Sequence, residues 1–218
     1  MKETFIGHKC KLLNSEKTGI TLELNSWSSE NMEEKYSVSF DKENIIERIT
    51  ENHISFGEKV SKTDFFKRLI RDIQVSDEKT REFASKILCD FLEFDIAYFD
   101  LKTLKFGIEK IIEQLTTEKN TNVEQKLAEG LFEFIWYKKL SKKEEIELLE
   151  RLTEIESYQV WSYLESELED DYDKLGSKKL KNYYIENKPK WDYKNDSLYG
   201  EKSILDKVKS IFTKKTSG

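Results

Sequence analysis

The sequence predicts a mainly α fold in which antiparallel helix hairpins stack as an irregular array, preceded by a small N-terminal β element. Apolar residues recur at helical spacing over most of the chain, short segments before residue 41 alternate apolar and polar residues, and several helical segments follow capping residues. We expect three parts: a β-strand element at 1–40 packed on the helices, a helical-repeat body at 41–187, and a basic, aromatic-rich segment at 188–218 ending in an amphipathic helix.

Two short strands are predicted near the N-terminus because apolar residues occupy every second position there. These residues are Ile20, Leu22 and Leu24 in one segment and Tyr36, Val38 and Phe40 in the other. A period of two is that of a strand with one buried face. A weaker alternation between Phe5 and Leu12 predicts a third strand. Three short strands do not form a domain alone, so we expect them to pack on the helices.

The period becomes helical after Asp41, which is expected to cap a helix carrying Ile45, Ile46 and Ile49. Further helices are predicted to begin at Ser61 or Thr63, after Ser76, and at Asp100, Thr121 and Ser141. The last two starts match the capping box, a hydroxyl residue followed three positions later by Glu. The only proline, Pro189, is predicted to break the chain, and a last amphipathic helix is expected at 204–212.

A shift of 44 residues superimposes two predicted helix pairs in one register. The first helix contributes Phe83, Ala84, Ile87, Leu88, Phe91 and Leu92, which fall on Leu127, Ala128, Leu131, Phe132, Ile135 and Trp136. Any two amphipathic helices can be aligned in part, so the match also has a trivial explanation. Agreement across two successive helices, with Ala84 matched to Ala128, favours a repeat. The period lies in the range of HEAT and armadillo units, in which each helix pair is buried by the next.

Charge is distributed unevenly along the chain. Residues 174–218 carry a net charge of +7, and the preceding 173 residues carry −13. The densest acidic run comes just before the change, at Glu165, Glu167, Glu169, Asp170, Asp171 and Asp173. Such a run is commonly a solvated helix face. It can also dock a basic protein, for which Tyr172 would add an aromatic contact. The run lacks the spaced ligands and central glycine of a calcium loop, which argues against a metal site.

No motif predicts catalysis, a cofactor or a metal. His8 and His53 have no metal-ligand neighbours at helical spacing, and the glycines form no phosphate-binding loop. Cys89 lies in an apolar helical pattern, which favours a buried free thiol over a disulfide with Cys10. We therefore expect a protein that is not an enzyme, with no cofactor. A hydrolase with unrecognised carboxylates remains a third class, which loss of activity on a single acid-to-amide change would reveal.

The C-terminal segment interleaves lysines with aromatic residues, among them Tyr183, Tyr184, Trp191, Tyr193 and Tyr199. Lysines beside aromatic platforms are typical of single-strand nucleic-acid binders. The acidic body and the scarcity of arginine argue against nucleic acid as a partner. The alternative interpretation is a cap on the helical array, with lysine stems crossing aromatic faces. No apolar run is long enough to span a bilayer, and we expect a cytoplasmic protein.

The helix pairs from Thr80 to Ile155 resemble small bacterial HEAT-like proteins. The likeness is carried by Phe83-Ala84-x-x-Ile87-Leu88 and Leu127-Ala128-x-x-Leu131-Phe132. It covers about a third of the chain and is similar in style to immunity proteins that neutralise bacterial toxins. The resemblance implies an antidote that blocks a basic toxin domain with an acidic, aromatic-rich surface. The competing hypothesis is an adaptor or regulatory protein whose basic C-terminal segment binds nucleic acid or an anionic surface.

Overall fold

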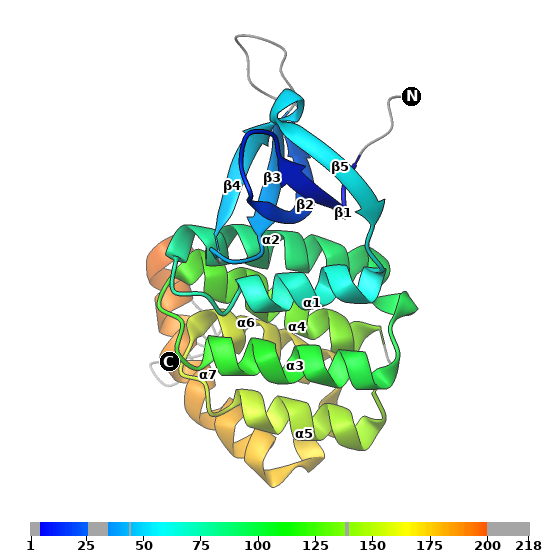
Figure 1. Cartoon of the computed structure of the whole chain (residues 1–218). Helices are drawn as coiled ribbons and strands as arrows, with labels where there is room; N and C mark the ends of the chain where they lie inside the picture. The colour runs from blue at the N-terminus through cyan, green and yellow to red at the C-terminus, as the bar shows by residue number, and fades with distance from the viewer. Residues whose placement is uncertain (1–4, 26–34, 44, 138–139, 200–218) are drawn as a thin grey trace, which may run out of the picture. The chain divides into compact units, whose positions relative to one another are not determined.

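The computed structural model of the chain describes residues 5–25, 35–43, 45–137 and 140–199. The chain divides into two units, Met1–Ser141 and Lys142–Gly218. The described residues form one antiparallel sheet and seven α-helices, which confirms a mostly helical protein with an N-terminal β element (Figure 1). The division after Ser141 differs from the expected parts 1–40, 41–187 and 188–218. The amphipathic helix expected at 204–212 lies outside the described residues.

The sheet of the first unit has five strands in the order β4-β3-β2-β1-β5, and each neighbouring pair is antiparallel. The strands are β1 (His8–Leu12), β2 (Thr18–Asn25), β3 (Lys35–Phe40), β4 (Ile46–Thr50) and β5 (Ile54–Lys59), with a short 3₁₀ turn, η1 (Glu51–His53), before the last. The three strands expected from the alternation are therefore confirmed. The β element extends to Lys59, well beyond residue 40.

The helix expected to follow Asp41 is wrong, because Ile46–Thr50 forms β4. Its residues pair with β3, for example Ile49 with Tyr36. Isoleucine and threonine are β-branched and suit a strand better than a helix, so pairing with β3 decided between two patterns that the local spacing left open. Asp41 forms an ion pair with Arg68 instead of capping a helix.

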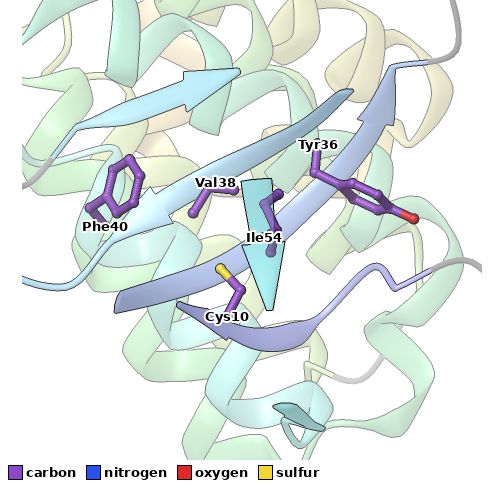
Figure 2. Close-up of a cluster of buried hydrophobic side chains, with 5 residues drawn as sticks. All are labelled: Cys10, Tyr36, Val38, Phe40 and Ile54. Carbon is purple, nitrogen blue, oxygen red and sulfur yellow. The ribbon is translucent and has the colours of Figure 1, made fainter. Parts of the chain in front are cut away.

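One face of the sheet encloses its own apolar cluster. The buried members are Cys10, Tyr36, Val38, Phe40 and Ile54. Figure 2 shows β5 crossing over the neighbouring strands, so that Ile54 faces Val38 and Cys10. The sheet therefore curls over its apolar side, and the apolar residues of its first and last strands are buried against the middle of β3.

The opposite face of the sheet is tied to the helices by a buried polar network. Ser39 Oγ donates a hydrogen bond of 2.5 Å to Asp72, which is fully buried. Arg71 binds the second oxygen of Asp72 and also the carbonyl oxygen of Phe40 at 3.0 Å. Burial raises the Asp72 pKa above its usual value although Ser39 and Arg71 oppose the shift. The network fixes the sheet on the helices because each buried charge is paired.

Four helices complete the first unit: α1 (Lys62–Asp72), α2 (Glu78–Asp95), α3 (Leu101–Leu115) and α4 (Thr121–Trp136). A short 3₁₀ turn, η2 (Ile96–Tyr98), follows α2. Ser61 and Asp100 cap α1 and α3, as predicted. The cap of α2 is Asp77, one residue after the expected Ser76, and the cap of α4 is Asn120. Because the Asn120 side chain binds two backbone N–H groups, Thr121 is the first helical residue of α4 and its capping box is not formed.

Successive helices of this unit are antiparallel, and alternate helices are parallel (Figure 1). At the start of α2, Glu78 accepts a hydrogen bond from Asn120, and one turn later Glu82 accepts one from Asn122. These pairs are 42 and 40 residues apart, and they advance in the same direction along α2 and α4. The same holds for α1 and α3, where Phe66 packs on Gly107 and Gln74 binds Glu113.

The second unit contains α5 (Lys142–Leu152), α6 (Tyr158–Asp170), a 3₁₀ turn η3 (Tyr172–Gly176) and α7 (Lys178–Tyr199). Its buried apolar residues include Leu149, Leu152, Trp161, Leu164, Leu168 and Leu180. The break expected at Pro189 is wrong, since the proline lies inside α7. Trp191, two residues after the proline, is buried, and its ring lies 5.6 Å from that of Tyr158. This packing on α6 stabilises the part of α7 that follows Pro189, although the proline has no backbone N–H to donate.

Among the described helices, none combines the length and the hydrophobicity that a bilayer-spanning segment requires.

Candidate functional site

The acidic run of the sequence, Glu165 to Asp173, is largely paired with lysines of the same unit. Glu165 and Glu169 both bind Lys188, at 2.6 and 2.8 Å. Asp173 binds Lys142 at 3.1 Å. Asp170 is exposed and forms no ion pair with any residue that the structure describes. Only part of the run therefore offers uncompensated charge to a partner.

Glu167 lies at the centre of a buried ion cluster. The Lys174 ammonium binds Glu167 and also Glu145, the latter at 2.6 Å, while Asp171 lies 3.8 Å away. The Lys174 side chain is only 4% exposed. Burial alone would lower the Lys174 pKa, but the hydrogen bonds to Glu145 and Glu167 outweigh it and raise that pKa. Glu167 thus contributes to the packing of α5, α6 and η3. The Tyr172 side chain lies outside the described residues.

Lysines and aromatic residues of α7 lie against α6 in a similar way. The Lys188 ammonium lies 5.3 Å from the centre of the Tyr184 ring, and the Lys190 ammonium lies 4.8 Å from that of Trp191. Lys190 also binds Glu156 at 2.8 Å. These contacts match the interpretation in which lysine stems cross aromatic faces on the helical unit. Of the expected basic segment, residues 200–218 lie outside the described part.

A second acidic group lies in the first unit, on the C-terminal halves of α2 and α4. We call Asp90, Glu93, Glu129 and Glu133 the α2–α4 acidic cluster. Glu129 binds Lys126 at 2.7 Å, whereas Asp90, Glu93 and Glu133 form no ion pair with described residues. Burial and the neighbouring charges of Glu93 and Glu129 raise the Glu133 pKa. Like charges are therefore held together here without sufficient neutralisation.

The position of this cluster on its helices strengthens its negative potential. The carbonyl ends of α2 and α4 point the same way because the helices are parallel, and each end carries partial negative charge. Neither helix has a basic residue in its last turn. A cation reaches the end of α2 from α1, because Lys62 binds Asp95 at 2.6 Å. In the sequence, Lys138 and Lys139 follow α4 directly, outside the described residues.

Exposed aromatic residues occur at the same helix ends. Phe94, near the end of α2, is 75% exposed, and Tyr98 in η2 is 70% exposed. Trp136 and Tyr137, at the end of α4, are 46% and 44% exposed. Large aromatic side chains beside charged groups are typical of the anchors of protein interfaces. This surface was not predicted from the sequence, although acidic residues without basic ones in the last turns of α2 and α4 were a visible signal.

The most buried ion pair of the first unit has a structural role. Arg81 binds both oxygens of Glu118, at 2.8 and 3.1 Å, and donates to the carbonyl oxygens of Val75 and Ser76. It thereby joins the α1–α2 connection to the α3–α4 connection. Burial would raise the Glu118 pKa, but Arg81, two backbone N–H donors and Gln114 lower it to about 2. A carboxylate with this pKa is a poor general base near neutral pH.

The remaining reactive groups do not form a site. Cys10 and Cys89 are buried free thiols, as the pattern around Cys89 predicted, and burial raises their pKa values to about 11 and about 12. No group of three or more ligand-type side chains among the described residues is arranged to hold a metal ion. No protein-family model, no curated protein and no solved structure matches the chain.

Proposed function

We propose that the protein is a binding scaffold without enzymatic activity and that it acts in the cytoplasm as an immunity protein against a basic bacterial toxin domain. The proposal rests on the α2–α4 acidic cluster, which presents unpaired carboxylates beside exposed aromatic residues at the ends of two parallel helices. A basic toxin domain is the partner that this chemistry fits, because cationic side chains would neutralise Glu93 and Glu133 on binding.

Charge and aromatic residues have separate roles in this proposal. The carboxylates attract a cationic domain from a distance and raise its association rate, an effect that salt screens. Phe94 and Tyr98 then supply apolar contact area that excludes water from the interface. The acidic run at Glu165–Asp173 is a weaker candidate for the same role, because five of its six carboxylates already form ion pairs with lysines of their own unit. Asp170 is the member most available to a partner, because it is exposed and forms no ion pair with a described residue.

The helical body is part of the same proposal. We interpret α1–α2 and α3–α4 as two HEAT-like units, because helices of like position lie parallel and contact each other about 40 residues apart. This pairing differs from the predicted one, in which the second and third helices formed one unit. Such stacking aligns the like ends of equivalent helices in successive units and would explain why acidic and aromatic residues of α2 and α4 share a surface.

The alternative function is an adaptor whose basic C-terminal segment binds nucleic acid or an anionic surface. Lys174 and Lys188 are engaged with carboxylates of their own unit, which leaves them little charge to offer. The ion pairs of these two lysines therefore favour the acidic surface over the basic C-terminal segment as the binding element. Binding of single-stranded nucleic acid by the full chain, abolished by neutralising lysines of α7, would favour the adaptor.

The test first asks whether a gene next to that of this chain encodes a secreted toxin with a basic domain, and that domain is then the binding partner. The purified full chain and that domain are mixed, and the association rate and affinity are measured at low and high salt. We expect Glu93→Gln combined with Glu133→Gln to lower the association rate about tenfold at low salt, with a smaller effect at high salt. The same exchange should weaken protection of a host that produces the toxin.

A matched control removes one carboxylate from the β1–β2 connection and one from β5, by Glu16→Gln combined with Glu58→Gln. Both residues are exposed. This control should leave association unchanged, because it alters net charge equally at another place. Asp170→Asn tests the acidic run without disturbing the Lys174 ion cluster. Equal rates for the two double variants would contradict the proposed surface, and a loss confined to Asp170→Asn would move the interface to the second unit.

A further inference from the structure

A basic hollow lies on the first unit, between β4 and the N-terminal halves of α2 and α4. Its volume is about 490 Å³, within the range of small-molecule sites. It is lined by Arg48 from β4, by Lys79, Glu82, Phe83 and Lys86 from α2, and by Asn122, Gln125 and Lys126 from α4. The parallel packing of α2 and α4 places these residues together. The α2–α4 acidic cluster lies further along the same two helices.

The lining has an excess of positive charge. Four cations and one carboxylate, that of Glu82, line it, whereas the whole chain has a net charge of −6. Lys126 is already paired with Glu129 at 2.7 Å, which leaves Arg48, Lys79 and Lys86 to supply the excess. Lys79 forms no ion pair with any described residue, and Lys86 has only a long contact, 3.9 Å, with Glu23. Lysines that folding does not neutralise are available to an anion.

The hollow also offers a flat, partly apolar surface. The guanidinium carbon of Arg48 lies 5.9 Å from the centre of the Phe83 ring, and that ring is only partly buried. A guanidinium and a phenyl ring both stack on planar groups. Asn122 and Gln125 supply amide donors and acceptors at the rim, although Asn122 already donates a hydrogen bond of 3.0 Å to Glu82. Cations, a planar surface and amides together fit a ligand that is both anionic and aromatic.

We propose that this hollow binds a nucleotide, with its phosphate groups on Lys79 and Lys86 and its base against Phe83 and Arg48. Phosphate groups suit the lysines because each is a point charge with several donors. The base suits the ring and the guanidinium because both tolerate any planar heterocycle. The proposal goes beyond a role in toxin neutralisation, since it concerns other residues and a small-molecule ligand.

The test measures binding of ADP to the full chain by isothermal titration calorimetry, with adenosine and inorganic pyrophosphate as partial ligands. We expect ADP to bind with a Kd below about 1 mM, and each partial ligand to bind at least about tenfold more weakly. No heat of binding with ADP at millimolar concentration would overturn the proposal. Pyrophosphate binding as tightly as ADP would also overturn it, because the planar surface would then contribute nothing.

Two variants locate the site. Lys79→Gln combined with Lys86→Gln should weaken ADP binding about tenfold or more and leave adenosine binding unchanged. Phe83→Leu should weaken binding of ADP and adenosine alike. The control is Lys67→Gln combined with Lys102→Gln, which removes the same charge from exposed positions of α1 and α3. If the control weakens ADP binding as much as the first variant, ADP binds by net charge and the proposed site is wrong. Urea unfolding curves establish that each variant is folded.

Discussion

The ammonium of Lys174 lies 2.6 Å from the carboxylate of Glu145, and Glu167 binds the same nitrogen. The cluster joins η3 to α5 and α6, and the Lys174 side chain is almost fully buried. A carboxylate in the most acidic part of the sequence is therefore held inside the second unit by a lysine seven residues later. Glu167 therefore contributes to the stability of the second unit.

Replacing Lys174 by Met should destabilise the second unit strongly. The substitution leaves Glu145 and Glu167 close together without a cation, and breaking a buried ion pair from one side costs about 3–5 kcal/mol. Urea unfolding at neutral pH measures the loss. Lys179→Met is the control, because the Lys179–Glu154 pair is exposed and such pairs contribute less than about 1 kcal/mol. Equal losses for the two variants would show that Lys174 has no special role.

The Glu118 carboxylate should make the first unit less stable in acid. Its pKa falls from 4.5 to about 2 on folding, so the native state keeps the charge at a pH where the unfolded chain is protonated. The stabilisation by Glu118 is present above pH 4.5 and is lost as the pH falls towards 2. The shift corresponds to about 3 kcal/mol.

Comparison of wild type with Glu118→Gln isolates this contribution from those of the other carboxylates. The variant should be about 3 kcal/mol less stable at neutral pH, and the gap should narrow as the pH falls below 4.5. Urea unfolding at several pH values measures it. Glu113→Gln, at an exposed position of α3, is the control. Its free energy of unfolding should differ little from that of wild type, and this difference should not narrow as the pH falls. A stability difference between wild type and Glu118→Gln that stays constant with pH would refute the lowered pKa of Glu118.

Gly107→Ala should destabilise the first unit although alanine favours helices. A Cβ atom at residue 107 would lie 2.4 Å from Cζ of Phe66, whose ring is fully buried. Overpacking of this kind costs about 1–3 kcal/mol, which exceeds the gain of about 1 kcal/mol in helix propensity. The control is Gly130→Ala, where the nearest atom is 3.3 Å away and belongs to the flexible Leu92 side chain. Combining Gly107→Ala with Phe66→Leu should recover part of the loss.

Local pattern was sufficient for most elements of the fold. Alternation located β2 and β3, and capping residues located α1 and α3 to within a residue. It failed for β4, because Ile45, Ile46 and Ile49 fit both helical spacing and a β-branched strand. The choice was made by pairing with β3, a contact between distant parts of the sequence. At α4 both Asn120 and Thr121 can cap, and local sequence does not choose between them.

The candidate surface was harder to predict than the fold. The acidic run was visible as charge, but its neutralisation depends on Lys174 and Lys188, which only folding brings to it. The pair Glu129 and Glu133 lies at helical spacing and is visible in the sequence. Glu93 joins them because α2 packs parallel to α4, so the crowding of carboxylates is a property of the tertiary structure. Charge counts along the chain cannot reveal it.

The α2–α4 acidic cluster should destabilise the protein in the absence of a partner. Glu129 and Glu133 are a like-charge pair four residues apart, which costs about 0.2–0.5 kcal/mol, and Glu93 adds to the repulsion. Because the Glu133 pKa is raised on folding, its charge opposes folding at any pH above that pKa. Glu93→Gln combined with Glu133→Gln should therefore raise the free energy of unfolding at neutral pH while it weakens partner binding.

Urea unfolding at low salt measures this gain, and high salt should reduce it because screening relieves the repulsion in the wild type. The control, Glu16→Gln combined with Glu58→Gln, removes carboxylates that each bind a lysine, so it should not stabilise the protein. A loss of stability in the cluster variant would mean that Glu93 and Glu133 support the fold. A gain in stability together with slower partner association would identify carboxylates that are kept for binding at the expense of the fold.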